Sequence, residues 1–140
     1  MKPMPDSHVF IDSNIIIYAY SDTEKTKQLI SRQLIKENST IISTQVLQEV
    51  ANALSRKFKI GYSAIAQTLQ ECILDNDVLY LNRQDTVFKA CNIAARYQFS
   101  FYDSLIIAAA LETNCSYLYS EDLQHKQVIA NALTIINPYI

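Results

Sequence analysis

The sequence predicts an α/β fold in which helices cover both faces of a parallel sheet. Short runs of β-branched and aromatic residues alternate with longer segments whose apolar residues follow a helical spacing, which is the pattern of repeated strand–helix–strand units. The chain has 140 residues, 49% of them hydrophobic, and mixed charges. This length and composition indicate one folded domain spanning residues 1–140.

Five segments are predicted as strands, and about seven helical segments lie between them. The strands are residues 9–11, 40–43, 78–81, 117–119 and a last one around 133–136. Ser21 with Glu24 three positions later is a capping-box pattern, which predicts a helix that runs towards Asn38. Gly61, the single glycine, is expected to end the helix that follows Ser43 and to separate it from the next helix.

A second cap-plus-acid pair, Asn82 and Asp85, precedes another helix. Its apolar residues keep a 3.6-residue spacing at Val87, Phe88, Cys91, Ala94 and Ala95. The three cysteines of the chain are widely spaced and form no CxxC pair, so zinc and redox motifs have no support. We expect all three to be small buried thiols.

Charge and hydropathy exclude several classes of function. The net charge is −2, so a protein that only binds nucleic acid would have to rely on a local basic patch. The N-terminus has Lys2, Pro3 and Pro5 without an apolar run, so no signal peptide is expected. The longest apolar run, residues 105–111, is too short to span a bilayer. We therefore expect a cytoplasmic protein.

The candidate functional residues are the acids Asp12, Glu49, Asp103 and Asp122. Three of them adjoin apolar runs, where a carboxylate is costly unless it is paired or binds a cation. Asp12 closes the first predicted strand, Glu49 follows the second, Asp122 follows the fourth, and Asp103 opens the helix that leads into the fourth. Because ligands bind beyond the carboxyl ends of parallel strands, the four acids are predicted to converge. Carboxylates gathered in this way favour Mg²⁺ or Mn²⁺.

Each acid also has a purely structural interpretation. Asp12 could be the N-cap of a helix that starts at Ser13. Glu49 lies in a polar stripe typical of a solvated helix face, formed by Gln45, Gln48, Glu49, Asn52 and Arg56. Ser100 and Asp103 form a cap-plus-acid pair at a helix start, and Asp122 follows polar turn residues.

Four motifs in order resemble those of PIN domains, the nuclease fold of VapC-type toxins. Segment 10–18, FIDSNIIIY, is similar to the opening of that family. Segments 43–50, STQVLQEV, 101–110, FYDSLIIAAA, and 118–125, LYSEDLQH, resemble its second, third and fourth acidic motifs. The resemblance covers nearly the whole chain.

The resemblance implies a PIN-like three-layer α/β/α fold with a five-stranded parallel sheet of order 3-2-1-4-5. It also implies a metal-dependent endoribonuclease, the toxin of a type II toxin–antitoxin pair, with one or two Mg²⁺ or Mn²⁺ ions as cofactors. Its expected partners are an RNA substrate, a small antitoxin protein and a second copy in a homodimer. Carried over by position, Asp12, Glu49, Asp103 and Asp122 are the catalytic and metal-binding acids, and Asn14 and Ser120 support them. Many members have Thr where this chain has Ser120, so the hydroxyl is kept.

The substrate would be held by a basic and aromatic rim, for which the candidates are Lys57, Lys59, Arg96 and Lys126. One alternative is a non-toxin or degenerate PIN module that binds RNA or protein without cutting, although all four acids are present. A receiver-like signalling domain in which Asp12 accepts a phosphoryl group is another alternative. It needs an acidic pair before the acceptor and a lysine after a late strand, and neither is evident. A haloacid-dehalogenase-like phosphatase would need aspartate in place of Asn14.

Overall fold

A six-stranded sheet forms the centre of the computed structural model, which describes residues 8–140. The strand order is β3-β2-β1-β4-β6-β5. The strands are β1 His8–Ile11, β2 Thr40–Ser43, β3 Val78–Tyr80, β4 Cys115–Tyr119, β5 Val128–Ile129 and β6 Leu133–Ile136. The residues used to argue against a signal peptide, Lys2, Pro3 and Pro5, lie outside the described range.

The α/β prediction is confirmed, and one strand was missed. The five predicted strands correspond to β1 to β4 and β6, they pair in parallel, and they follow the order 3-2-1-4-5. The additional strand β5 is antiparallel to β6 at the edge of the sheet. It escaped prediction because it has two residues and its hairpin turns through Ala130 and Asn131 in the left-handed region, where glycine is the usual signal.

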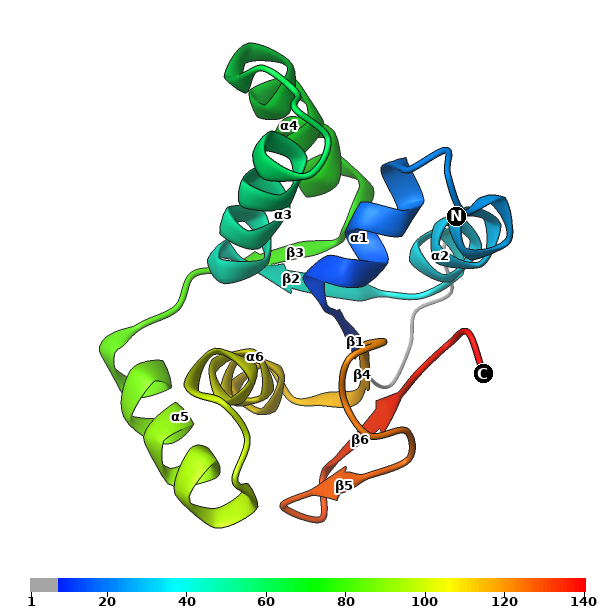
Figure 1. Ribbon diagram of the computed structural model, residues 1–140. Helices are drawn as coiled ribbons and strands as arrows, with labels where there is room; N and C mark the ends of the chain where they lie inside the picture. The colour runs from blue at the N-terminus through cyan, green and yellow to red at the C-terminus, as the bar shows by residue number, and fades with distance from the viewer. Residues whose placement is uncertain (1–7) are drawn as a thin grey trace.

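Six helices, fewer than the seven or so predicted, complete the three layers of the described chain (Figure 1). They are α1 Ser13–Tyr20, α2 Lys25–Glu37, α3 Thr44–Arg56, α4 Tyr62–Asp75, α5 Gln84–Tyr97 and α6 Phe101–Glu112. In Figure 1, α1 to α4 lie above the sheet, and α5 and α6 lie below it. Helix α6 is buried from residue 104 to residue 110, as its continuous apolar sequence predicts.

Three predicted helix boundaries are wrong. Helix α5 begins at Gln84, and its N-cap is Arg83 in place of Asn82. Helix α2 begins at Lys25, and Ser21 ends α1 instead: its N–H donates to the Tyr18 carbonyl at 3.2 Å, and its hydroxyl pairs with Thr23. Helix α3 ends at Arg56, and the left-handed residue after it is Lys59. The Ile60 N–H closes this turn on the Leu54 carbonyl at 3.1 Å, so the helix stops without a glycine. Gly61 has ordinary backbone angles and caps the start of α4.

The apolar stripe of α5 does not face the core as a whole. The buried residues of this helix are Thr86, Ala90 and Ile93, whereas Val87 and Phe88 are 41% and 59% exposed. Cys91 is exposed as well, so the prediction of three buried thiols holds only for Cys72 and Cys115. None of the helices within residues 8–140 is long and apolar enough to cross a membrane.

Candidate active site

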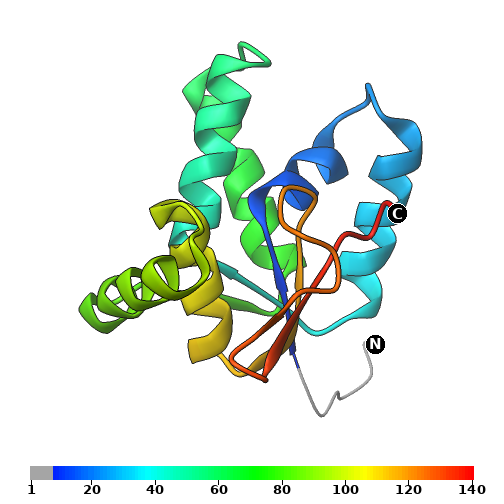
Figure 2. The same cartoon turned by 60° about the horizontal axis from the view of Figure 1, so that its bottom comes forward.

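Asp12 stands where β1 ends and α1 begins. The parallel register pairs Ile11 with Tyr119, so the next residues of the two strands, Asp12 and Ser120, are neighbours. The Ser120 hydroxyl donates to Asp12 Oδ2 at 2.8 Å, and the Ser13 backbone N–H donates to Asp12 Oδ1 at 2.7 Å. Asp12 therefore is the N-cap of α1, and its carboxylate is only 6% exposed. Figure 2 shows the segment after β4 beside the start of α1.

Burial raises the pKa of the Asp12 carboxyl from 3.8 to about 7. The hydrogen bonds from Ser120 and Ser13 oppose this rise, whereas the negative charges of Glu49 and Asp103 add to it. Desolvation and nearby like charges both disfavour the ionised form of a carboxyl group. A cation beside Asp12 would reverse both effects.

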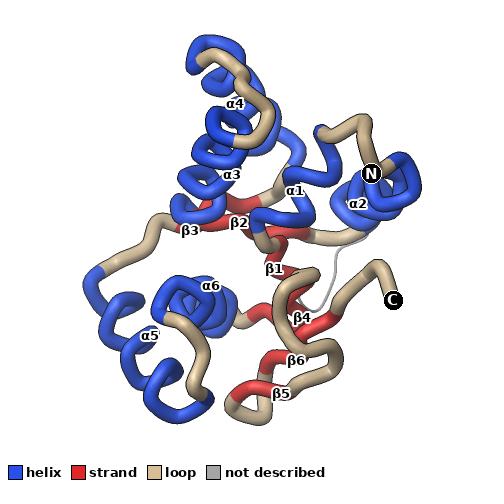
Figure 3. The backbone as a smooth tube through the Cα atoms, viewed as in Figure 1, coloured by secondary structure: helices blue, strands red, loops and turns tan. Residues whose placement is uncertain are grey.

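The connection after β4, residues 120–127, supplies the fourth acid (Figure 3). The Asn14 side-chain amide donates to Asp122 Oδ2 at 3.1 Å and to the Ser120 hydroxyl at 3.4 Å. The side-chain oxygen of Asn14, Oδ1, accepts a hydrogen bond from the Glu121 N–H at 3.2 Å. Asn14 and Ser120, predicted as supporting residues, thus join Asp12 to Asp122 in one hydrogen-bonded set.

Glu121 lies beside Asp122 in the sequence but belongs to a different cluster. One carboxylate oxygen of Glu121 accepts a hydrogen bond from the Tyr18 hydroxyl at 2.7 Å. The other oxygen forms an ion pair with the Lys27 ammonium at 2.5 Å. Partial burial raises the pKa of Glu121, but these two donors outweigh burial and lower the pKa below its ordinary value. Glu121 is therefore a poor candidate for a metal ligand.

Glu49 is not a solvated surface residue. It projects from α3, and the pKa of its carboxyl is raised, chiefly by burial. Its Oε1 atom is buried and has no hydrogen-bond partner within residues 8–140. Gln45, one turn earlier, is only 4% exposed, and its Nε2 donates to the Tyr102 carbonyl at 3.0 Å and to Glu49 Oε2 at 3.5 Å. The structural alternative of a solvated stripe is thus wrong for Gln45 and Glu49, although Gln48, Asn52 and Arg56 are exposed.

Asp103 occupies the first turn of α6. The Ser100 hydroxyl accepts the Asp103 N–H at 3.1 Å, as the capping pattern predicted. The charge of Asp103 raises the pKa of both Asp12 and Glu49, so the carboxylate lies within electrostatic reach of both. Next to it, the fully buried Ser104 hydroxyl has no hydrogen-bond partner in the described part of the chain.

Gln45, Ser13 and Ser104 are the polar residues of this region that sequence reasoning missed. A signal for Gln45 was present, because residues four apart on a helix share a face and Gln45 stands four before Glu49. The Ser13 side chain lies near Glu49 and lowers the pKa of its carboxyl. No comparable sequence signal marks the hydroxyl of Ser104.

The four acids have the charge and the oxygen donors that a divalent cation needs. Their side chains, however, do not yet surround a common point as a complete set of ligands would. No three His, Cys, Asp or Glu side chains of residues 8–140 are close enough to hold a metal ion as they stand. The unpartnered Glu49 Oε1 and the raised pKa of Asp12 nevertheless mark a place that lacks positive charge. Binding an ion would require at least one side chain to turn inward.

The four predicted basic residues differ in their relation to this site. Lys57, Lys59, Arg96 and Lys126 are all exposed. Lys57 lines a cavity that also includes Asn14 and Asp122. Arg96 lies over the Tyr97 ring, 5.1 Å from its centre, on α5.

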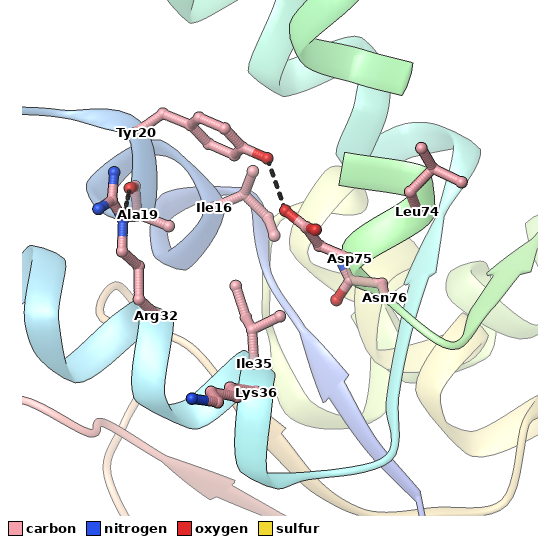
Figure 4. Close-up of a pocket in the computed structure, with 9 residues that line it drawn as sticks. All are labelled: Ile16, Ala19, Tyr20, Arg32, Ile35, Lys36, Leu74, Asp75 and Asn76. Atoms are coloured by element: carbon pink, nitrogen blue, oxygen red, sulfur yellow. Dashed lines mark hydrogen bonds between the residues drawn. The ribbon is translucent and has the colours of Figure 1, made fainter. Parts of the chain in front are cut away.

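A larger cavity of about 510 Å³ lies between α1, α2 and the end of α4 (Figure 4). Its polar side chains tie these helices together: the Tyr20 hydroxyl donates to Asp75 at 3.1 Å, and Arg32 donates to the Ala19 carbonyl at 2.8 Å. Burial is the main cause that raises the pKa of Tyr20. None of the four candidate acids lines this cavity, so it has no part in their chemistry.

Comparison with known proteins identifies the fold. A model of the PIN domain matches residues 9–130. No curated protein sequence matches the chain.

Three solved structures are similar. The chain resembles VapC20 of Mycobacterium tuberculosis, described as a sarcin–ricin loop cleaving toxin, with 17% identity, a TM-score of 0.64, and coverage of 79% of this chain and 86% of that one. It resembles VapBC2 from Rickettsia felis, bound to a DNA fragment from the promoter, with 18% identity, a TM-score of 0.66, and coverage of 92% and 98%. It resembles FitAB bound to a DNA fragment, with 11% identity, a TM-score of 0.65, and coverage of 94% of this chain and 96% of that one. At these identities the similarity shows a shared fold.

Proposed function

The chain belongs to the PIN domain family, and on that premise we propose that it is a metal-dependent endoribonuclease. The supporting observation is the buried Asp12 carboxyl, whose pKa is raised to about 7 beside the negative charges of Glu49 and Asp103. Perturbed carboxyls of this kind are typical of catalytic and metal-binding sites. Asp122 joins the set through Asn14.

Asp12, Glu49, Asp103 and Asp122 are the residues that would hold one or two Mg²⁺ or Mn²⁺ ions. When bound, such ions supply a water of lowered pKa and neutralise negative charge that develops on a phosphate. Oxygen ligands of this kind suit hard divalent cations.

The other residues of the site act by orienting these acids. Ser120 and the Ser13 N–H fix both oxygens of Asp12, and the Asn14 amide fixes Asp122. Helices α1 and α6 begin at Asp12 and just before Asp103, so their positive ends favour negative charge here. The same N-termini would favour the phosphate of an RNA backbone.

The test is cleavage of a short labelled single-stranded RNA by the purified protein. We expect cleavage with Mg²⁺ or Mn²⁺, none in EDTA, and none by Asp103→Asn protein purified in parallel. The variant controls for a contaminating ribonuclease, which would survive the substitution. Undiminished cleavage in EDTA by the parent protein would refute metal dependence. Binding without cleavage under every metal condition would favour the degenerate module.

We further propose that the nuclease is a toxin held inactive by a small antitoxin in the cytoplasm. The similarity to VapC20, VapBC2 and FitAB supports this assignment. Expression of the chain alone should slow growth by blocking translation, and co-expression with a small protein encoded beside it should restore growth. Normal growth with abundant folded protein would point to a non-toxin PIN nuclease.

A homodimer is proposed because α5 presents apolar side chains to solvent. Val87, Phe88 and Cys91 follow a helical spacing on this helix and are exposed in the single chain. Light scattering after size exclusion should give twice the 16.0 kDa mass of the chain. Phe88→Glu should shift the protein to the monomer, and a parent protein that is monomeric at micromolar concentration would refute the dimer.

A further inference from the structure

A second cavity, of about 210 Å³, adjoins the candidate acids. Asp122 and its partner Asn14 line it, and so do Lys57 and Phe58, which follow the end of α3. Pockets for drug-sized ligands start at about 300 Å³, so this cavity suits a smaller group. Its place beside Asp122 puts it next to any phosphate held at the four acids.

Most polar groups that line this cavity already have partners. The Tyr18 hydroxyl donates to Glu121 and accepts from Lys27 at 3.3 Å. Both oxygens of Glu121 are taken by Tyr18 and Lys27, and Lys27 also cancels the charge of Glu121. The Asn14 amide is engaged with Ser120, Asp122 and the Glu121 N–H. These groups therefore cannot read the hydrogen-bonding edge of a ligand without breaking existing bonds.

Aromatic surface and one cation remain available. The Tyr18 ring is already engaged, because Lys27 Nζ lies 4.7 Å from its centre and the Tyr139 ring packs edge-on against it at 5.2 Å. Phe58 is 38% exposed and makes no such ring contact within residues 8–140, so part of its ring is open to a ligand. The Lys57 ammonium makes no ion pair with any residue of the described range 8–140. An exposed aromatic ring beside a cation that makes no ion pair complements a flat heterocycle attached to a phosphate.

We infer that this cavity is a nucleotide subsite of the proposed ribonuclease, which takes the base next to the cleaved phosphate. The base stacks on Phe58, and Lys57 contacts the adjoining phosphate. Because the polar groups around it are already paired, the subsite selects for the presence of a base and not for its identity. This inference rests on the proposed function for the position of the RNA, but it makes its own prediction about binding.

The experiment measures binding of a fluorescein-labelled, unstructured RNA by anisotropy, in Mn²⁺ and in the Asp103→Asn background so that the RNA stays intact. Phe58→Ala should weaken binding by about 5- to 150-fold, the effect of losing one stacked base. Phe58→Tyr, which keeps the ring, should bind within about twofold of the background protein. Because Phe58 is partly exposed, both variants are expected to fold, and their melting curves check this.

An abasic RNA makes the test specific to the base. When one base at a time is removed from the RNA, the protein with Phe58 should lose affinity at one position in particular. The Phe58→Ala protein should show no further loss at that position, since the stacking partner is already gone. Equal losses in both proteins would overturn the inference, because Phe58 would then act only on the shape of the protein. Replacing A by U at that position should change affinity far less than removing the base.

Lys57 is tested against Lys59, an exposed lysine two residues away that does not line the cavity. Lys57→Ala should reduce the slope of log affinity against log salt concentration by about 0.7, the value for one contact to single-stranded nucleic acid. Lys59→Ala should change the slope less; an equal change would indicate a diffuse basic surface and overturn the assigned role of Lys57.

Cleavage of the same RNA by proteins with Asp103 intact keeps the two proposals apart. Cleavage with Mn²⁺ but without dependence on Phe58 overturns the subsite alone. Binding that depends on Phe58 without any cleavage overturns the ribonuclease and supports the subsite. Absence of RNA binding by the Asp103→Asn background protein overturns the subsite, and if the parent also fails to cleave RNA, the ribonuclease is overturned with it.

Discussion

Replacing Asp12 with Asn should stabilise the metal-free protein. The carboxyl is 6% exposed and accepts hydrogen bonds from the Ser13 N–H and the Ser120 hydroxyl. Asparagine has the same shape and caps helices about as well as aspartate, so its Oδ1 can still accept the Ser13 N–H. Its Nδ2 is a donor, so pairing with Ser120 requires the Ser120 hydroxyl to turn and accept. The substitution therefore removes the buried negative charge and keeps the cap.

The size of the effect follows from the pKa of Asp12. The folded chain holds this proton more tightly than the unfolded chain, because the pKa rises from 3.8 to about 7 on folding. The free energy of unfolding therefore falls as pH rises through this interval, and the total loss is about 4 kcal/mol at about 1.4 kcal/mol per pH unit. Asp12→Asn should escape this loss, so its advantage over the parent grows from near zero at pH 4 to about 4 kcal/mol at pH 8.

The assay is urea unfolding of the parent and the variant in EDTA at several pH values. In thermal unfolding at pH 8, even half of the full difference in free energy of unfolding would raise the melting temperature of the variant by about 8 °C. Two controls separate charge from capping. Asp12→Ala removes the cap at a cost of about 1 kcal/mol and should be less stable than Asp12→Asn at every pH. Asp85→Asn, at an exposed position in the first turn of α5, should be slightly destabilising.

An advantage of Asp12→Asn that does not change with pH would refute this reasoning. So would a variant less stable than the parent throughout, because Asp12 would then serve only as a cap.

Three further predictions concern the same residues. Saturating Mn²⁺ should raise the melting temperature of the parent and do much less for Asp103→Asn, as differential scanning fluorimetry would show; equal shifts would argue against Asp103 as a ligand. Mn²⁺ affinity should increase as pH rises to about 7, where Asp12 becomes ionised. Ser120→Ala should move this rise to higher pH, because the Ser120 hydrogen bond lowers the pKa of Asp12. Calorimetry with Ser120→Thr as the control tests this, and an unchanged pH profile in Ser120→Ala would refute it. Glu121→Gln should lower the melting temperature by breaking the pair with Lys27 yet leave Mn²⁺ affinity unchanged; a large loss of affinity would make Glu121 a ligand after all.

The sequence predicted the five parallel strands well because each is a short β-branched or aromatic run between helical segments. Of these strands, β1 and β2 are buried almost throughout, whereas β3 is partly exposed. The predicted placement of the four acids near the carboxyl ends of the strands follows one topological rule. The prediction failed where a turn forms without its usual sequence signal. At the end of α3, Lys59 adopts the left-handed conformation that Gly61 was expected to supply. The turn is closed by a bond from Ile60 to Leu54, which no local pattern reports.

The face on which a polar residue lies was harder to predict than its secondary structure. The stripe containing Gln45 and Glu49 has the amphipathic pattern of a surface helix. Its first turn, however, packs where α6 begins, so Gln45 donates to the Tyr102 carbonyl and is buried. On α5 the error is reversed, since Val87 and Phe88 are apolar and exposed. Both cases depend on neighbouring helices that are distant in sequence.

Structural and functional interpretations of the acids need not compete. The cap on α1 holds Asp12 in place, and the cap on α6 orders the turn that carries Asp103. The groups that contact each carboxyl then determine its pKa and its role. Glu121 receives Lys27 and Tyr18, its pKa falls, and it is committed to structure. Asp12 receives only hydroxyl and amide donors, and burial together with the neighbouring negative charges raises its pKa. In the proposed nuclease, a divalent cation would supply the positive charge that the carboxylate of Asp12 lacks.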